Sequence, residues 1–140
     1  MYKHAHVVLL ALTLVAVLMV PAAQAQTITL KADIPFDFVV GEKRLPQGEY
    51  LVKPFSPTAT MIQSNDTRSS AIVLTSAVSA PKAMDVGKLV FNRYGDQYFL
   101  SRIWEPASNL GRGVAKSHLE HEVAKAMANP PTNVAVRIQK

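Results

Sequence analysis

Strand-length apolar segments, separated by Gly, Pro, Asn and Asp, fill most of the chain beyond residue 26. In the first of them, residues 33–40, apolar side chains occupy every second position, with a proline and two aspartates among the residues between them. This alternation predicts a strand with one buried face. Pro35 has no backbone N–H to donate to a neighbouring strand, so we expect this strand to lie at a sheet edge.

Residues 88–104 form the best-defined unit of the sequence. Gly95-Asp96 suits a two-residue type II′ turn, because glycine tolerates the positive φ of the first turn position. That turn would place Phe91 opposite Leu100 in an antiparallel hairpin. Both faces of the hairpin carry apolar residues, so we expect it to be covered on both sides.

The hydrophobic period changes after this hairpin. Ser117-x-x-Glu120 fits a capping box, and apolar residues then recur at helical spacing. The fold class is therefore predicted as mainly β, a small sandwich or partly open barrel of about six or seven strands with one C-terminal helix. We expect the helix near residues 117–128, the last strand near 133–139, further strands at 49–53, 58–63 and 70–75, and loops at 76–83 and 105–113.

The first 25 residues have the pattern of a secretory signal peptide. A short basic start precedes the apolar run Val7–Val20, and Ala23-x-Ala25 offers a cleavage site before Gln26. An uncleaved anchor is the alternative, but the run is shorter than the roughly 20 residues that a spanning helix needs. We therefore expect one domain over residues 26–140, secreted or periplasmic, with membrane contact only transiently through the leader.

Composition excludes several kinds of chemistry. The chain has no cysteine, so disulfides, thiol catalysis and thiolate metal sites are ruled out. Its net charge of +5 is scattered, and only Lys43-Arg44 are adjacent basic residues beyond the leader, whereas nucleic-acid binding needs a clustered basic surface. No glycine-rich phosphate loop is present, so we expect no cofactor and no nucleic-acid partner.

Catalytic patterns are equally sparse. No nucleophile-elbow or related serine motif occurs. Asp33 and Asp37 could resemble a carboxylate pair, but four strand residues would hold them roughly 13 Å apart, farther than the roughly 5–9.5 Å of glycosidase pairs. We assign no catalytic residue, and the sequence favours a non-enzymatic protein without deciding the question.

Two sets of side chains could bind a ligand. His118, His121 and Glu122 would share one face of the expected helix and could hold zinc or copper. That face is the solvent side, opposite the apolar positions, so we assign no metal site and keep the three residues only as a weak candidate.

The second set lies in the hairpin. Arg93, Tyr98, Arg102 and Trp104 would share one face and could bind a ligand through stacking and cation–π contacts. The alternative is a half-buried sheet face in which arginine stems cover aromatic rings.

Three motifs occur along the strand-rich part of the chain: IPFxFxxG at residues 34–41, LPxGxY at 45–50 and YFLxxIW at 98–104. With these motifs the chain resembles a group of small exported β-rich bacterial proteins of unknown function. The resemblance implies a compact β-rich domain in a bacterial envelope or extracellular setting. It implies no activity.

Together these features predict an exported, non-enzymatic envelope or extracellular module. Its expected partner is an envelope protein, a glycan or a small ligand. A small hydrolase with an unrecognised site is one alternative. A self-assembling structural protein, forming homo-oligomers through an exposed strand within residues 27–40, is another.

Overall fold

The computed structural model describes residues 28–139, and within them the chain is mainly β with one helix, as predicted. The leader and its cleavage site at Ala23, Ala25 and Gln26 lie outside the described residues. No helix within residues 28–139 is long and apolar enough to cross a bilayer. The elements are β1 Leu30–Ile34, β2 Phe38–Val40, β3 Lys43–Leu45, β4 Gly48–Ser56, β5 Ala59–Ser64, β6 Ser70–Met84, β7 Lys88–Tyr94, β8 Gln97–Trp104, β9 Ser108–Val114, α2 His118–Ala126 and β10 Thr132–Gln139.

Eight of the ten strands form a closed barrel. Their order is β8-β7-β10-β1-β4-β5-β6-β9, and the ring closes where Arg102–Trp104 of β8 pair with Gly113–Gly111 of β9. The β2–β3 hairpin adds to the other half of β8 through the parallel pair Val39↔Phe99. The expected six or seven strands and partly open barrel are thus corrected to ten strands within residues 28–139, eight of which form a closed ring.

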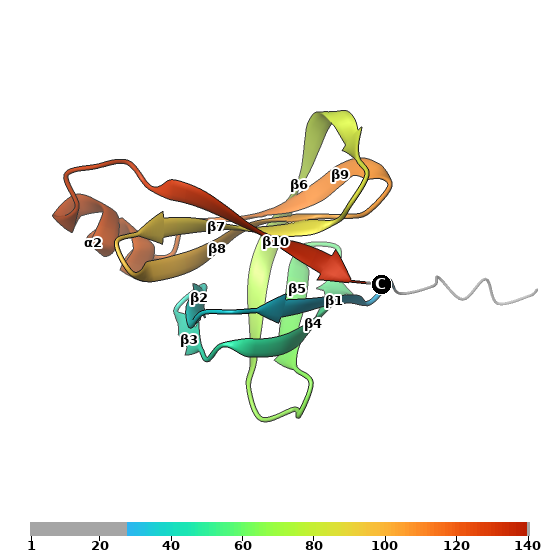
Figure 1. The fold of residues 1–140 in the computed structure, drawn as a ribbon, viewed down its shortest axis with the longest axis horizontal. Coiled ribbons are helices and arrows are strands. Elements are labelled where there is room, and N and C mark those ends of the chain that lie inside the picture. The colour runs from blue at the N-terminus through green and yellow to red at the C-terminus, as the bar shows by residue number, and fades with distance from the viewer. Residues whose placement is uncertain (1–27, 140) are drawn as a thin grey trace, which may run out of the picture.

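Two long strands pass from one layer of this flattened barrel to the other. β6 pairs with β5 as far as Leu74 and with β9 from Thr75 onward. β10 pairs with β7 as far as Arg137 and with β1 at Ile138 and Gln139. Figure 1 shows β10 crossing between the layer of β7 and β8 and the layer of β1, β4 and β5, with β6 and β9 projecting beyond them.

The prediction of loops at residues 76–83 and 105–113 is wrong, because parts of these two segments pair with each other as strands. Ser76 lies opposite Gly113 and Ser79 opposite Leu110 in the β6–β9 ladder. These stretches are rich in Ser, Ala, Gly and Pro, which have low strand propensity. Pairing uses backbone groups, so such residues can form a ladder when neighbouring strands bring them together.

The predicted strand 33–40 is divided in two. β1 ends at Ile34, and Asp37 instead uses its Oδ1 to accept a 2.9 Å hydrogen bond from the backbone N–H of Gln47. β1 lies between β4 and β10, and β2 lies between β3 and β8. The expected sheet edge is therefore wrong. Within residues 30–40, the segment considered for self-association has neighbouring strands on both sides, with β10 paired at Lys31 and Ala32 and β8 paired at Val39.

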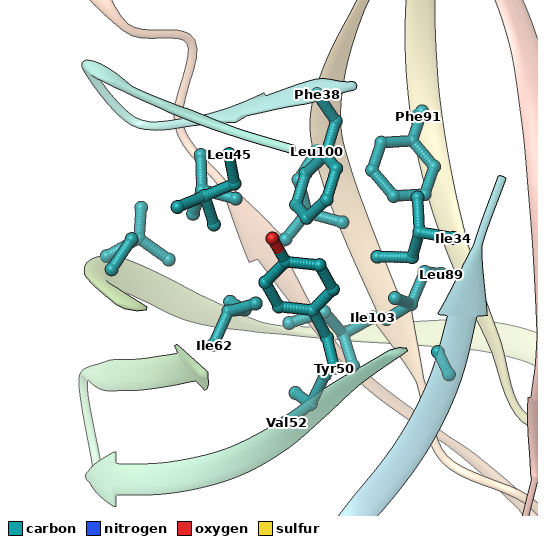
Figure 2. Packing of buried hydrophobic residues seen from close by; sticks show 14 of the residues in the cluster. Ile34, Phe38, Leu45, Tyr50, Val52, Ile62, Leu89, Phe91, Leu100 and Ile103 are labelled. Atoms are coloured by element: carbon teal, nitrogen blue, oxygen red, sulfur yellow. The ribbon is translucent and has the colours of Figure 1, made fainter. Parts of the chain in front are cut away.

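The alternation nevertheless identified core residues correctly. Ile34, Phe38 and Val40 belong to the main core, and Phe36 packs against it. Figure 2 shows the Tyr50 ring among core side chains that include Phe38, Leu100 and Ile62. The Tyr50 hydroxyl donates a 2.6 Å hydrogen bond to the backbone oxygen of Pro46, which satisfies its polar group inside the core.

Helix α2 covers the outer face of the β7–β8 hairpin, on the side away from the main core. Leu119 and Val123 pack on a second cluster that includes Tyr94 and Phe99. Ser117 caps the helix by accepting a 3.1 Å hydrogen bond from the Glu120 N–H, as the capping box predicts for its serine. The hairpin is thus covered on both faces.

Candidate ligand site at one end of the barrel

A β-bulge divides the four hairpin residues that the sequence placed on one face. From the turn, the pairs Arg93↔Tyr98 and Phe91↔Leu100 have the predicted register. Val90 then pairs with Arg102, so Ser101 has no partner in β7. The extra residue reverses which side chains point inward beyond it. The assumption of a shared face is therefore wrong.

Arg93 and Tyr98 stay on the inner side at the turn end of the hairpin. The Tyr98 ring stacks on Phe36 with centroids 3.8 Å apart, and the Arg93 guanidinium lies 5.5 Å from the Tyr98 centroid. Arg93 Nε also donates a 2.7 Å hydrogen bond to the Gly95 oxygen. Arg93 and Tyr98 thus contact other residues of the protein, and the stacked Phe36 and Tyr98 rings pack at this end of the barrel.

Arg102 and Trp104 lie on the outer side of β8. Arg102 is exposed, whereas Trp104 is only 7% exposed. Trp104 pairs with Gly111 of β9, where an added Cβ would lie 2.6 Å from the indole ring. The tryptophan therefore packs over a glycine in the neighbouring strand, and it is separated from Tyr98.

The three helix residues considered for metal binding are all exposed. His118 Nε2 lies 3.6 Å from Glu122 Oε1, one turn away, and His121 adds a third side chain on the same helix. Among residues 28–139, no three or more His, Asp or Glu side chains are arranged so that they could hold a metal ion. Asp33 and Asp37, the other pair considered, belong to different segments: Asp33 lies in β1 and Asp37 lies between β1 and β2.

A buried carboxylate lies beneath the helix. Glu120 is 3% exposed, and its Oε1 accepts hydrogen bonds of 2.9 Å from Asn92 Nδ2 and 3.1 Å from the Tyr94 hydroxyl. Burial raises the pKa of Tyr94 to about 12, with further contributions from the Glu120 charge and this hydrogen bond. The capping box identified Glu120, but its side chain fastens α2 to β7. Its role is therefore structural.

A hollow lies at the opposite end of the barrel from the Phe36–Tyr98 stack. It has a volume of about 450 Å³. Its walls come from the start of β1, the end of β4, the start of β5, the end of β8 and the middle of β9. The lining is mostly apolar and comprises Ile28, Leu30, Val52, Pro54, Phe55, Ser56, Pro57, Thr60, Ile103, Glu105 and Arg112.

Among residues 28–139, Arg112 is the positively charged residue that lines this hollow. It pairs with Ile103, whose side chain belongs to the main core, and is itself half-buried. Its Nη1 donates a 3.0 Å hydrogen bond to the Pro57 oxygen across the barrel end and approaches Thr75 Oγ1 at 3.5 Å. Both partners are neutral, and no ion pair within residues 28–139 includes Arg112.

Sequence reasoning missed this site because Arg112 falls in the segment interpreted as a loop. The pairing of β9 with β6 and β8 determines that the Arg112 side chain points into the barrel. The local sequence offered one hint. Glycines at 111 and 113 flank the arginine, and their missing side chains leave room for close neighbours on the adjacent strands.

Comparison with protein-family models, curated proteins and solved structures found no match.

Proposed function

We propose that this protein is an exported, non-enzymatic module that binds one small, mainly apolar molecule in the hollow at the end of its barrel. The observation that carries the proposal is the hollow itself. Eight-stranded barrels have interiors just wide enough to be filled by side chains or to hold one small ligand. Here side chains fill one end, and the other end keeps about 450 Å³ open.

The hollow has the properties of a small-molecule site. Its volume lies within the roughly 300–1,000 Å³ typical of ligand pockets. Apolar side chains dominate its walls, and a few polar groups, chiefly Thr60, Glu105 and Arg112, stand among them. This combination supplies apolar contact area for affinity and a few directional groups for orientation.

The hydrolase alternative has weaker support in the same place. The Thr60 hydroxyl lies 3.3 Å from the Thr75 hydroxyl, and both residues are buried. A nucleophilic hydroxyl needs an adjacent general base, and these hydroxyls instead bond each other. Binding is thus the function that the geometry favours.

We infer the cellular location of the protein from its leader sequence. A basic start, an apolar run and the Ala23-x-Ala25 site support cleavage before Gln26 and a secreted or periplasmic protein. We propose that the protein binds its ligand in that compartment, in keeping with its resemblance to small exported bacterial proteins. Native mass spectrometry of the exported protein would give the mass of the processed chain and of any retained ligand.

Amide NMR with octanol as an uncharged apolar probe tests the binding site directly. We expect saturable shift changes confined to the ends of β4 and β8 and the start of β1. Phe55, 61% exposed at the hollow, gives the test variant Phe55→Ala, which should weaken binding several-fold. Ile72, 55% exposed on β6 and outside this hollow, gives the matched control Ile72→Ala. Shifts that do not saturate, or equal effects of both variants, would refute the proposal.

A further inference from the structure

We infer that the ligand of this hollow is a small amphipathic acid whose anionic group binds the Arg112 guanidinium. This inference rests on the proposed function and names the ligand's chemical class. Its basis is the placement of a half-buried, positively charged side chain in a mostly apolar hollow, without a carboxylate partner among residues 28–139.

Arg112 is held in place by contacts that leave most of its donors available. A guanidinium has five N–H donors, and the two contacts of Arg112 both involve Nη1. Because Pro57 and Thr75 are neutral partners, they orient the side chain without neutralising its charge. A carboxylate or similar anion could accept two parallel hydrogen bonds from the remaining donors, which is the strong geometry for arginine.

The rest of the lining favours a ligand with a hydrocarbon body. Leu30, Val52 and Ile103 are buried core residues that form the floor, and Phe55 is an exposed aromatic side chain at the rim. An apolar chain lying on this floor would be removed from water, which is favourable in proportion to the area buried. A ligand with a polar body would lose hydrogen bonds to water without replacement.

Glu105 sharpens the inference, since it lines the same hollow with the opposite charge. Arg112 is anchored to the Pro57 oxygen, whereas no hydrogen bond of the Glu105 side chain is found within residues 28–139. We therefore take Arg112 as the anchor and Glu105 as a repulsive neighbour that weakens the binding of anions. Removing the glutamate charge should strengthen anion binding.

The test compares octanoate, octanol and octylammonium, which share one hydrocarbon chain and differ in head-group charge. Dissociation constants come from calorimetry or amide NMR on the exported protein. We expect octanoate to bind about tenfold or more tightly than octanol, the range of a charge-assisted hydrogen bond. Octylammonium should bind more weakly than octanoate.

Two variants check the assignment of the anchor. Glu105→Gln should tighten octanoate severalfold and leave octanol unchanged. Arg112→Gln should abolish the preference of octanoate over octanol. Because Arg112 also connects β9 to the turn at Pro57, Arg112→Gln could unfold the protein. Arg112→Lys, which keeps the charge but not the planar fork, should retain only part of the preference.

The outcomes separate the inference from the function on which it rests. Equal affinity for octanoate and octanol would overturn the acidic ligand and leave the binding module standing. Tighter octylammonium would overturn it by making Glu105 the anchor. Failure of all three probes to bind the hollow would count against the proposed function itself. Weaker octanoate binding in Glu105→Gln would also contradict the assigned roles.

Discussion

Removing the Tyr94 hydroxyl should measure how firmly α2 is fastened to the barrel. Tyr94 is 3% exposed, and its hydroxyl donates a 3.1 Å hydrogen bond to the equally buried Glu120 carboxylate. In Tyr94→Phe the ring keeps its edge contact with Phe99, 5.7 Å between centroids, and only the polar group is lost. Glu120 keeps its bond from Asn92 Nδ2. The substitution therefore isolates one bond.

The expected magnitude follows from the charge of the acceptor. Hydrogen bonds to charged groups contribute about 1.5–3 kcal/mol, against about 0.5–1.5 kcal/mol for neutral pairs. Tyr94→Phe should therefore lower the free energy of unfolding by about 1.5–3 kcal/mol. For a domain of this size, roughly 4 °C of Tm per kcal/mol gives a decrease of about 6–12 °C. In a Glu120→Gln background the same change should cost only about 0.5–1.5 kcal/mol.

Urea unfolding of the four proteins in this double-mutant cycle would give the coupling between the two side chains. Tyr98→Phe is the matched control, because no hydrogen bond of its hydroxyl is found within residues 28–139, and it should change stability by less than about 0.5 kcal/mol. Equal costs for Tyr94→Phe and Tyr98→Phe, or a coupling near zero, would refute the claim that the buried carboxylate fastens the helix through Tyr94.

Three further predictions concern pH, packing and the surface. The folded protein holds the Tyr94 proton up to a pKa of about 12, against 10.0 for an ordinary tyrosine. The associated stability is therefore complete below about pH 10 and lost between about pH 10 and 12, so the difference in urea midpoint between wild type and Tyr94→Phe should shrink over that interval. Gly111→Ala would place a Cβ 2.6 Å from both the Ile103 oxygen and the Trp104 ring, and should cost about 1–3 kcal/mol; Gly113→Ala, whose nearest contact is 3.1 Å, should cost less in the same unfolding assay. Glu49→Gln removes the exposed 2.9 Å ion pair with Lys31 and should change stability by less than about 1 kcal/mol; a larger loss would show that this pair is not screened as its exposure implies.

Local chemistry made the turn half of the β7–β8 hairpin predictable. Gly95 has a φ of +62°, and among non-glycine residues 28–139 only Thr67 and Ala107 have positive φ, so Asp96 does not. This is the sign pattern of a type II′ turn, and it fixed the Phe91↔Leu100 pair. The alternation in residues 33–40 likewise identified core side chains, because a period of two is a property of the strand itself.

The parts that could not be predicted depend on partners distant in sequence. Edge position is one example: Pro35 indicated an edge, but it lies just past β1, where no ladder bond is needed. β9 is another, since its residues have low strand propensity and its ladder bonds come from β6 and β8. Arg112 gains an inward direction only through those pairings, so no pattern within residues 105–113 could assign it to a site.

The bulge at Ser101 explains both why the four hairpin residues do not share one face and which β8 side chain lines the proposed site. With regular alternation from Tyr98, the inner face of β8 would carry Arg102 and Trp104, as the sequence suggested. The unpaired residue reverses the order, so Ile103 points into the barrel opposite Leu89 while Arg102 faces outward. An apolar side chain thereby lines the hollow in place of a second arginine, and Arg112 on the neighbouring strand remains its positive group. The bulge that disperses the predicted binding face is thus what gives the barrel end its apolar floor, with Arg112 as its cation among residues 28–139.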